Sequence, residues 1–223
     1  MRTEAGGPPL RILIVDDHSL LVEALRLSLS SGDTDRSPIE VMTSPSLDRD
    51  EILDVADHEQ PDVVLVDLDL GDGRTGTDII RPLSAAGHRV VLFTGATEAR
   101  ELGDGLDAGA SGIVRKTEPF HRLVISISDA ASGRNLGRPA EREELIAEAR
   151  RSRGHDDDRE ARLASLSRRE REILDQLAQG STAAQVASES FVSLATVRSQ
   201  IKSILRKLGV SSQLAAVAIA RSE

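Results

Sequence analysis

Five polar side chains stand at or near the ends of short apolar runs, and together they could handle a phosphoryl group. Asp16 and Asp17 follow LRILIV, Asp67 follows VVLV, Thr94 follows VVLF, and Lys116 follows GIVR. Three carboxylates can hold a hard Mg²⁺ ion, and one of them can attack phosphorus in line. A hydroxyl and an ammonium can bind the phosphoryl oxygens. Any one such residue is ordinary at a strand end, but five at successive strand ends predict a phosphoryl-transfer site.

These residues are spaced by an alternation of β-branched runs and amphipathic stretches. Strands are predicted at 10–15, 39–43, 63–67, 90–93 and 112–115, and helices near 19–30, 47–58, 77–86, 98–108 and 119–132. Five strands alternating with five helices predict an α/β domain over residues 8–133, a flavodoxin-like, doubly wound, five-stranded parallel sheet. Ligands bind such sheets at the carboxyl ends of the strands, where the five polar residues stand.

Residues 10–132 resemble the receiver domain of bacterial two-component response regulators. ILIVDDHSL, VVLVDLDL, VVLFTG and GIVRKTEP stand where that family has its acidic pair, its phosphoacceptor, its switch Thr and its Lys. The resemblance implies phosphorylation by a sensor histidine kinase. The roles that it implies are Mg²⁺ binding by Asp16, Asp17, Asp67 and the backbone carbonyl of Asp69, phosphorylation of Asp67, and phosphoryl binding by Thr94 and Lys116.

The chain departs from the receiver pattern at two places. Gly76 stands one position later than the family's Gly, and Leu70 and Gly71 replace its Met-Pro pair, so a longer and more mobile loop is expected after Asp67. Ile113 stands where the family commonly has Tyr or Phe, which swings inward when the Thr engages phosphate. These departures keep a second reading open, in which the domain is a binding or dimerisation module and the protein regulates DNA without phosphorylation.

The motif DLDLG at residues 67–71 allows a third and remote reading as a haloacid dehalogenase-like phosphatase. In that family the first Asp attacks phosphate and the second is the general acid. Its motif follows the first strand, however, and its acidic metal pair comes after the Lys. Here the acidic pair precedes Asp67 by about 50 residues, and a motif is accepted only in its proper context. The protein is therefore not expected to be an enzyme.

Residues 163–223 have a purely helical pattern with the spacing of a helix-turn-helix unit. Ser167 with Glu170 and Thr182 with Gln185 are predicted capping boxes, a third helix begins at Ser193 and runs to about residue 208, and a fourth covers 212–221. LSRREREILDQLAQG, VASESFVSLATVRSQIKSILRKLGV and SSQLAAVAIA resemble the DNA-binding domain of NarL/LuxR-type regulators.

The third of these helices is amphipathic. Its apolar positions are expected to share a core with the neighbouring helices; the residues concerned are Val197, Ile201, Leu205 and Leu208 with Ile173, Leu174, Leu177, Val186 and Val192. Arg198, Ser199, Lys202 and Arg206 lie on its opposite face, which suits the major groove of double-stranded promoter DNA. The resemblance implies base contacts by Arg198, Ser199 and Lys202. It also implies a homodimer in the active state through Leu214, Val217 and Ala218.

Residues 134–162 are predicted to be a helical and charged linker. A helix is expected to begin at Pro139 and to stop at Gly154, with HDDDRE as solvated chain after it. Residues 1–133 carry 12 basic and 24 acidic residues, a net charge of −12, whereas residues 134–223 carry 16 and 13, a net charge of +3. Only the second half is therefore expected to approach nucleic acid.

Composition excludes several classes of protein. The chain has no cysteine, which excludes disulfides, Cys-ligated zinc and thiol catalysis. Three Phe residues are its only aromatic side chains, so stacking on bases is not its mode of binding. No apolar run approaches the roughly 18 residues of a membrane span. A cytoplasmic, phosphorylation-responsive transcriptional regulator with no membrane partner is the function that the sequence predicts.

Overall fold

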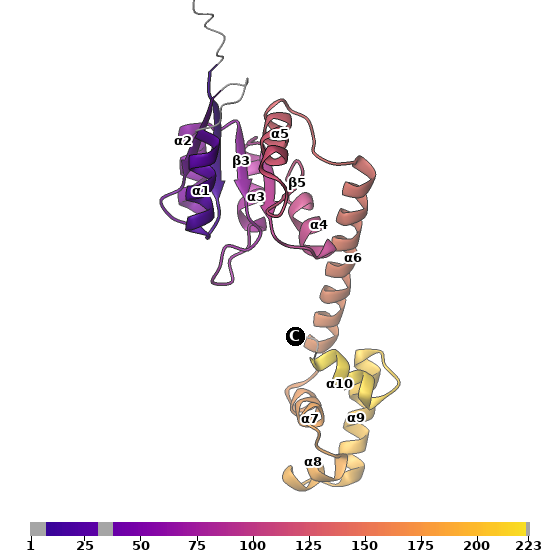
Figure 1. Ribbon diagram of the computed structural model, residues 1–223. Coiled ribbons are helices and arrows are strands. Elements are labelled where there is room, and N and C mark those ends of the chain that lie inside the picture. Colours follow the sequence, from indigo (N-terminus) through magenta and orange to yellow (C-terminus); the bar gives the residue numbers. More distant parts are fainter. Residues whose placement is uncertain (1–7, 31–37, 222–223) are drawn as a thin grey trace, which may run out of the picture. The chain divides into compact units, whose positions relative to one another are not determined.

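The computed structural model describes residues 8–30 and 38–221, and the chain divides into two compact units, residues 1–150 and residues 151–223 (Figure 1). The predicted C-terminal domain ended at residue 223, and its last two residues lie outside the described part. Each unit is described by itself. In the part of the chain that the structure describes, no helix is long and apolar enough to cross a membrane.

The first unit is built on a parallel sheet of five strands in the order β2-β1-β3-β4-β5. The strands are β1 (Leu10–Val15), β2 (Ile39–Thr43), β3 (Val63–Val66), β4 (Val90–Thr94) and β5 (Ile113–Arg115). The buried strands β3 and β4 consist almost entirely of β-branched and large apolar residues, as expected where helices cover both faces of a sheet. The predicted flavodoxin-like fold is confirmed.

Helices cover the sheet on both faces (Figure 1). The first unit contains α1 (Ser19–Ser30), α2 (Arg49–Glu59), α3 (Thr77–Ala85), α4 (Ala99–Asp107) and α5 (Phe120–Ala131). One buried cluster joins alternate strand residues to α2, α3 and α4, and the other joins the remaining strand residues to α1 and α5. Because successive side chains of a strand point to opposite faces, each strand contributes to both cores.

The predicted stop at Gly154 is wrong, because α6 runs without interruption over Pro139–Ala164. Glycine costs about 1 kcal/mol inside a helix, which favourable charge pairs one turn apart can offset. One such pair joins Asp158, in the segment HDDDRE that is predicted to be solvated chain, to Arg162 four residues later. HDDDRE is therefore part of a helix.

The second unit also contains α7 (Arg168–Ala178), α8 (Ala183–Glu189), α9 (Leu194–Leu208) and α10 (Gln213–Arg221). Both predicted capping boxes are present, at Ser167 and at Thr182, and Ser193 caps α9. The predicted core is confirmed except at Val192, which is 38% exposed because it lies in the turn before α9; Ile201 and Leu205 are partly buried and pack against the core. Ile204, which the prediction omitted, is buried instead.

Candidate phosphoryl-transfer site and basic recognition helix

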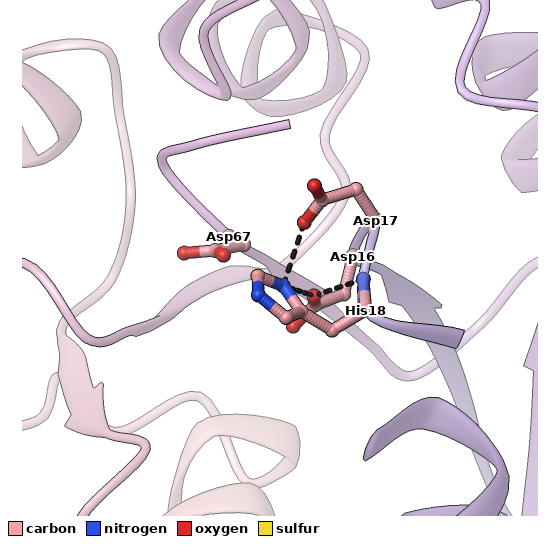
Figure 2. Close-up of side chains that lie close together, drawn as sticks. All are labelled: Asp16, Asp17, His18 and Asp67. Atoms are coloured by element: carbon pink, nitrogen blue, oxygen red, sulfur yellow. Dashed lines mark hydrogen bonds and ion pairs between the residues drawn. The ribbon is translucent and has the colours of Figure 1, made fainter. Parts of the chain in front are cut away.

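The acidic side chains predicted from the sequence meet at the carboxyl edge of the sheet. β1 and β3 are neighbours in register, and the backbone N–H of Asp67 donates to the carbonyl of Val15 at 2.9 Å. Asp16 and Asp17, which follow β1, therefore lie beside Asp67, which follows β3. Carboxylate oxygens of Asp16, Asp17 and Asp67 and a ring nitrogen of His18 all lie within 4.8 Å of one another (Figure 2).

His18 is the member of this cluster that sequence reasoning missed. Its Nδ1 lies 2.7 Å from Asp17 Oδ1 and 3.1 Å from Asp16 Oδ1, as Figure 2 shows. Its backbone N–H also donates to Asp16 Oδ1 at 2.9 Å. The available signal was its place directly after the acidic pair, where the chain turns from β1 into α1.

Lys116 holds two of the three carboxylates. Its Nζ lies 2.6 Å from Asp67 Oδ2 and 2.7 Å from Asp16 Oδ2. The side chains of Asp16 and Asp67 are only 1% and 5% exposed, so both charges depend on this partner. Burial acts to lower the pKa of Lys116, but the hydrogen bonds and the negative charges of Asp16 and Asp67 together outweigh it and raise that pKa. Lys116 therefore remains an ammonium ion at neutral pH.

Asp67 itself is held in a fixed orientation. One carboxylate oxygen accepts the backbone N–H of Leu68 at 2.7 Å, and the other accepts Lys116. Gly76 lies against its backbone, because a Cβ atom at residue 76 would stand 2.0 Å from the Asp67 carbonyl oxygen. Only glycine fits there, although it stands one position later than the receiver pattern.

The loop between Asp69 and Gly76 is closed by its own backbone. The N–H of Leu70 donates to the carbonyl of Arg74 at 3.2 Å, and Leu70 is fully buried. The exposed side chain of Asp69 accepts the N–H of Gly71 at 3.0 Å. The side chain of Asp69 therefore stabilises the loop, whereas the mobility expected of this loop and the metal role expected of the Asp69 carbonyl stay predictions.

Thr94 lies at the same edge but has a different partner. It is 1% exposed, and its hydroxyl oxygen accepts the backbone N–H of Ala96 at 3.0 Å. Within the described residues it makes no hydrogen bond to Asp67. The structure thus brings together Asp16, Asp17, Asp67 and Lys116, and leaves the hydroxyl of Thr94 on the β4–α4 connection.

The donor set fits a hard divalent cation. Three carboxylates gather at one point, and oxygen is the ligand atom that Mg²⁺ prefers. Asp17 is exposed while Asp16 and Asp67 are buried, so water can reach one side of the cluster. Mg²⁺ usually keeps several water ligands, which such a half-open site permits.

The predicted DNA-contact residues form an exposed stripe on α9. Arg198, Ser199, Lys202 and Arg206 are all exposed, while Val197, Ile204 and Leu208 on the other side of the helix are buried. Among the residues that the structure describes, none of the three cations forms an ion pair. They are therefore free to meet an external anion. Of the predicted dimer residues, Leu214 and Ala218 are exposed and Val217 packs against the core.

A buried glutamate fixes α9 to α7. Glu170 accepts hydrogen bonds from Lys207 at 2.6 Å, from Ser203 at 2.8 Å and from the N–H of Ser167 at 2.8 Å. The hydrogen bond from Lys207 is the largest cause that lowers the pKa of Glu170, to about 2. Sequence reasoning identified Glu170 only as half of a capping box and missed its contacts with α9.

Comparison with known proteins assigns both units. Residues 12–128 match the family model of the response regulator receiver domain, and residues 164–220 match that of bacterial regulatory proteins, luxR family. The nitrate/nitrite response regulator protein homolog of Haemophilus influenzae is 31% identical over 94% of this chain and 95% of its own length. The nitrate/nitrite response regulator protein NarP of Escherichia coli is 30% identical over 93% of each chain.

A solved structure has the same architecture. The RcsB response regulator of Salmonella typhimurium aligns over 96% of this chain and 99% of its own, with a TM-score of 0.51 and 21% identity. At that identity the likeness concerns the fold alone. The relatives named above are response regulators, and both family models describe regulatory proteins, which removes the phosphatase reading. The chain belongs to the response regulators that join a receiver domain to a LuxR-type DNA-binding domain.

Proposed function

We propose that this chain is a two-component transcriptional regulator that accepts a phosphoryl group on Asp67 from a sensor histidine kinase and binds promoter DNA through α9. The observation that carries this proposal is a pair of charged sites in one chain. One is a carboxylate cluster whose two buried members, Asp16 and Asp67, contact Lys116, and the other is an exposed cationic stripe. The proposed domains are a receiver at 8–133, a linker at 134–162 and a DNA-binding domain at 163–223.

The phosphoryl step uses Asp67 as nucleophile. A carboxylate oxygen of Asp67 attacks the phosphorus of a phosphohistidine, the new P–O bond forms, the P–N bond breaks, and the imidazole leaves with a proton from solvent. Lys116 already contacts Asp67 and can bind a phosphoryl oxygen. Thr94 is proposed to bind another. Asp16 and Asp17 with Asp67 are the residues that would hold Mg²⁺, which supplies positive charge for the phosphoryl oxygens.

The DNA-binding step uses the α9 stripe. Arg198, Ser199 and Lys202 are proposed to reach base edges in the major groove, and Arg206 a phosphate. Leu214 and Ala218 expose small and apolar surface on α10, and we propose that α10 pairs two copies of the chain when the regulator is active. A protein that meets both a kinase domain and promoter DNA acts in the cytoplasm.

Intact mass measurement tests the phosphoryl step. Incubation with a small phosphodonor and Mg²⁺ should add one phosphoryl group to the wild-type chain and none to D67N. D69N is the matched control, because it removes the neighbouring carboxylate and should leave the mass gain in place. A folded wild-type chain whose mass does not change would overturn phosphorylation at Asp67.

The phosphorylation-independent reading is motivated by the two departures from the receiver pattern, the altered loop after Asp67 and Ile113 in the place of an aromatic residue. In that case the receiver acts only as a binding module. Binding of promoter DNA by D67N and by the wild type with equal affinity, with and without phosphodonor, would establish this alternative.

A further inference from the structure

The connection between β4 and α4 is held at Ala96 by two hydrogen bonds. The N–H of Ala96 donates to Thr94 Oγ1 at 3.0 Å. The carbonyl of Ala96 accepts a hydrogen bond from the guanidinium of Arg115. One peptide unit on each side of this residue is thus fixed, the first by the proposed phosphoryl-binding hydroxyl and the second by a side chain from β5.

The sheet explains why Arg115 can reach this connection. Thr94 and Arg115 are Cα partners in the parallel pairing of β4 with β5, and the N–H of Lys116 donates to the carbonyl of Thr94 at 3.0 Å. The N–H of Arg115 donates to Glu118 at 3.2 Å, which fixes the backbone at this point. Arg115 therefore starts beside Thr94 and extends to the residue two positions after it.

Arg115 also stands close to where the receiver pattern has its aromatic residue. Residues of a strand that are two apart point to the same face, so Arg115 and Ile113 share one face of β5. Both line a cavity of about 280 Å³, together with Leu102 of α4 and Leu145 of α6. From this cavity the side chain of Arg115 reaches the β4–α4 connection, where its guanidinium donates to the carbonyl of Ala96.

This arrangement fixes the orientation of the Thr94 hydroxyl. An oxygen that accepts the N–H of Ala96 keeps its own proton available for a second partner. The orientation of Thr94 depends on the position of Ala96, and that position depends on Arg115. A group that is oriented before its ligand arrives binds that ligand with a smaller loss of entropy.

We propose that Arg115 is a positioning residue that sets the Thr94 hydroxyl through Ala96, in the place where receivers commonly use an aromatic side chain at position 113. This inference rests on the proposed phosphorylation of Asp67. Arg115 does not contact the phosphoryl group, and its effect reaches Thr94 only through the Ala96 peptide units.

Amide hydrogen exchange at Ala96, followed by NMR, tests the contact without any phosphodonor. R115M keeps the length of the side chain and removes the donor, and it should accelerate exchange at Ala96 about fivefold, the effect of losing one hydrogen bond. T94V, which removes the acceptor, should do the same. R115K keeps a donor and should remain within about twofold of the wild type. R81M is the matched control, a cation lost from the exposed surface of α3.

The second measurement is the response to beryllofluoride with Mg²⁺. In the wild type we expect slower exchange over residues 95–107, and in R115M a smaller change although the phosphodonor still adds one phosphoryl group. Unchanged exchange at Ala96 in R115M, or a full response to beryllofluoride in that variant, would overturn the role of Arg115. Failure of the wild type to gain mass would instead overturn the proposed function, and the resting exchange at Ala96 would still decide whether Arg115 fixes Thr94.

Discussion

The two charged regions of this chain use opposite physical arrangements. At the sheet edge, Asp16 and Asp67 are buried, and the partly buried Lys116 contacts both at 2.6–2.7 Å. On α9, Arg198, Lys202 and Arg206 are exposed, and none of them forms an ion pair within the described residues. A buried pair depends on its geometry, since either charge alone is costly to bury. Exposed, unpaired cations attract anions from solution, over a distance that shortens as the salt concentration rises.

Substitutions in the two regions should therefore differ in their effect on protein stability and in whether Mg²⁺ or salt changes that effect. Loss of Lys116 should reduce stability strongly, because it leaves two buried carboxylates without this cation, and Mg²⁺ should change the size of that loss. Loss of one member of the α9 stripe should leave stability unchanged and reduce DNA binding in a manner that depends on salt.

The largest effect is expected from K116M. This change leaves the carboxylates of Asp16 and Asp67 buried beside each other without a cation, and it should lower the free energy of unfolding by about 3 kcal/mol. Mg²⁺ should restore part of that loss, because it would bring positive charge to the same oxygens. Chemical denaturation with and without Mg²⁺ measures both effects. R26M is the control, since Arg26 pairs with Glu23 on the surface. Equal stability of K116M and the wild type without Mg²⁺ would show that the pairing is not structural.

The double variant R198A/K202A should reduce DNA affinity about 30-fold, or about 2 kcal/mol, with little change in stability. Because each phosphate contact contributes close to one unit to the salt dependence, and Arg206 is the residue proposed to contact a phosphate, R206A should make the slope of log affinity against log salt shallower by about one. Fluorescence anisotropy of labelled duplex DNA over a salt series gives both values. Unchanged affinity and slope would remove α9 from the DNA interface.

The second unit also contains a buried charge, Glu170, whose loss should have an intermediate effect on stability. E170Q keeps the shape of the side chain but removes the negative charge that Lys207 contacts, and should lower the free energy of unfolding by about 1.5 kcal/mol at neutral pH. Because the pKa of Glu170 is lowered to about 2 in the folded state, this contribution is fully present above about pH 5 and is lost as the pH falls toward 2.

The difference in stability between E170Q and the wild type should therefore shrink as the pH falls from 5. Urea denaturation at several pH values follows this difference. A difference that is constant over that range would mean that the charge of Glu170 contributes nothing and that only its shape matters.

The smallest effect is expected from D158N in α6. Asp158 and Arg162 form an exposed pair one helical turn apart, and such pairs contribute about 0.3–0.5 kcal/mol. Circular dichroism during thermal unfolding at low and high salt should show a small loss that salt removes. A loss above about 1 kcal/mol would mean that this exposed pair contributes more to stability than exposed pairs usually do.

The sequence predicted the fold because its signals were local and repeated. Apolar runs such as VVLV before Asp67 and VVLF before Thr94 mark buried parallel strands, and Ser167 and Thr182 begin helices through capping boxes that the structure contains. Strand ends of a parallel sheet converge, so the meeting of Asp16, Asp17 and Asp67 followed from the order of the elements.

The features that were missed depend on contacts and local geometry that residue type alone does not specify. Gly154 looked like a helix stop because propensity was judged without the charge pair one turn further along. Val192 had the right residue type for the core, but the turn before α9 leaves it partly exposed. The partner of the Thr94 hydroxyl is a backbone N–H, and no sequence pattern indicates which backbone group a buried hydroxyl will choose.

The central claim is that phosphorylation of Asp67 at one charged region controls DNA binding at the other. The most direct test measures the affinity of the wild type and of D67N for the same promoter duplex, before and after treatment with phosphodonor and Mg²⁺, with intact mass recorded in parallel. We predict that the wild type gains one phosphoryl group and binds DNA more tightly, while D67N changes in neither respect. Tighter binding by D67N after the same treatment, or a phosphorylated wild type whose affinity is unchanged, would contradict the claim.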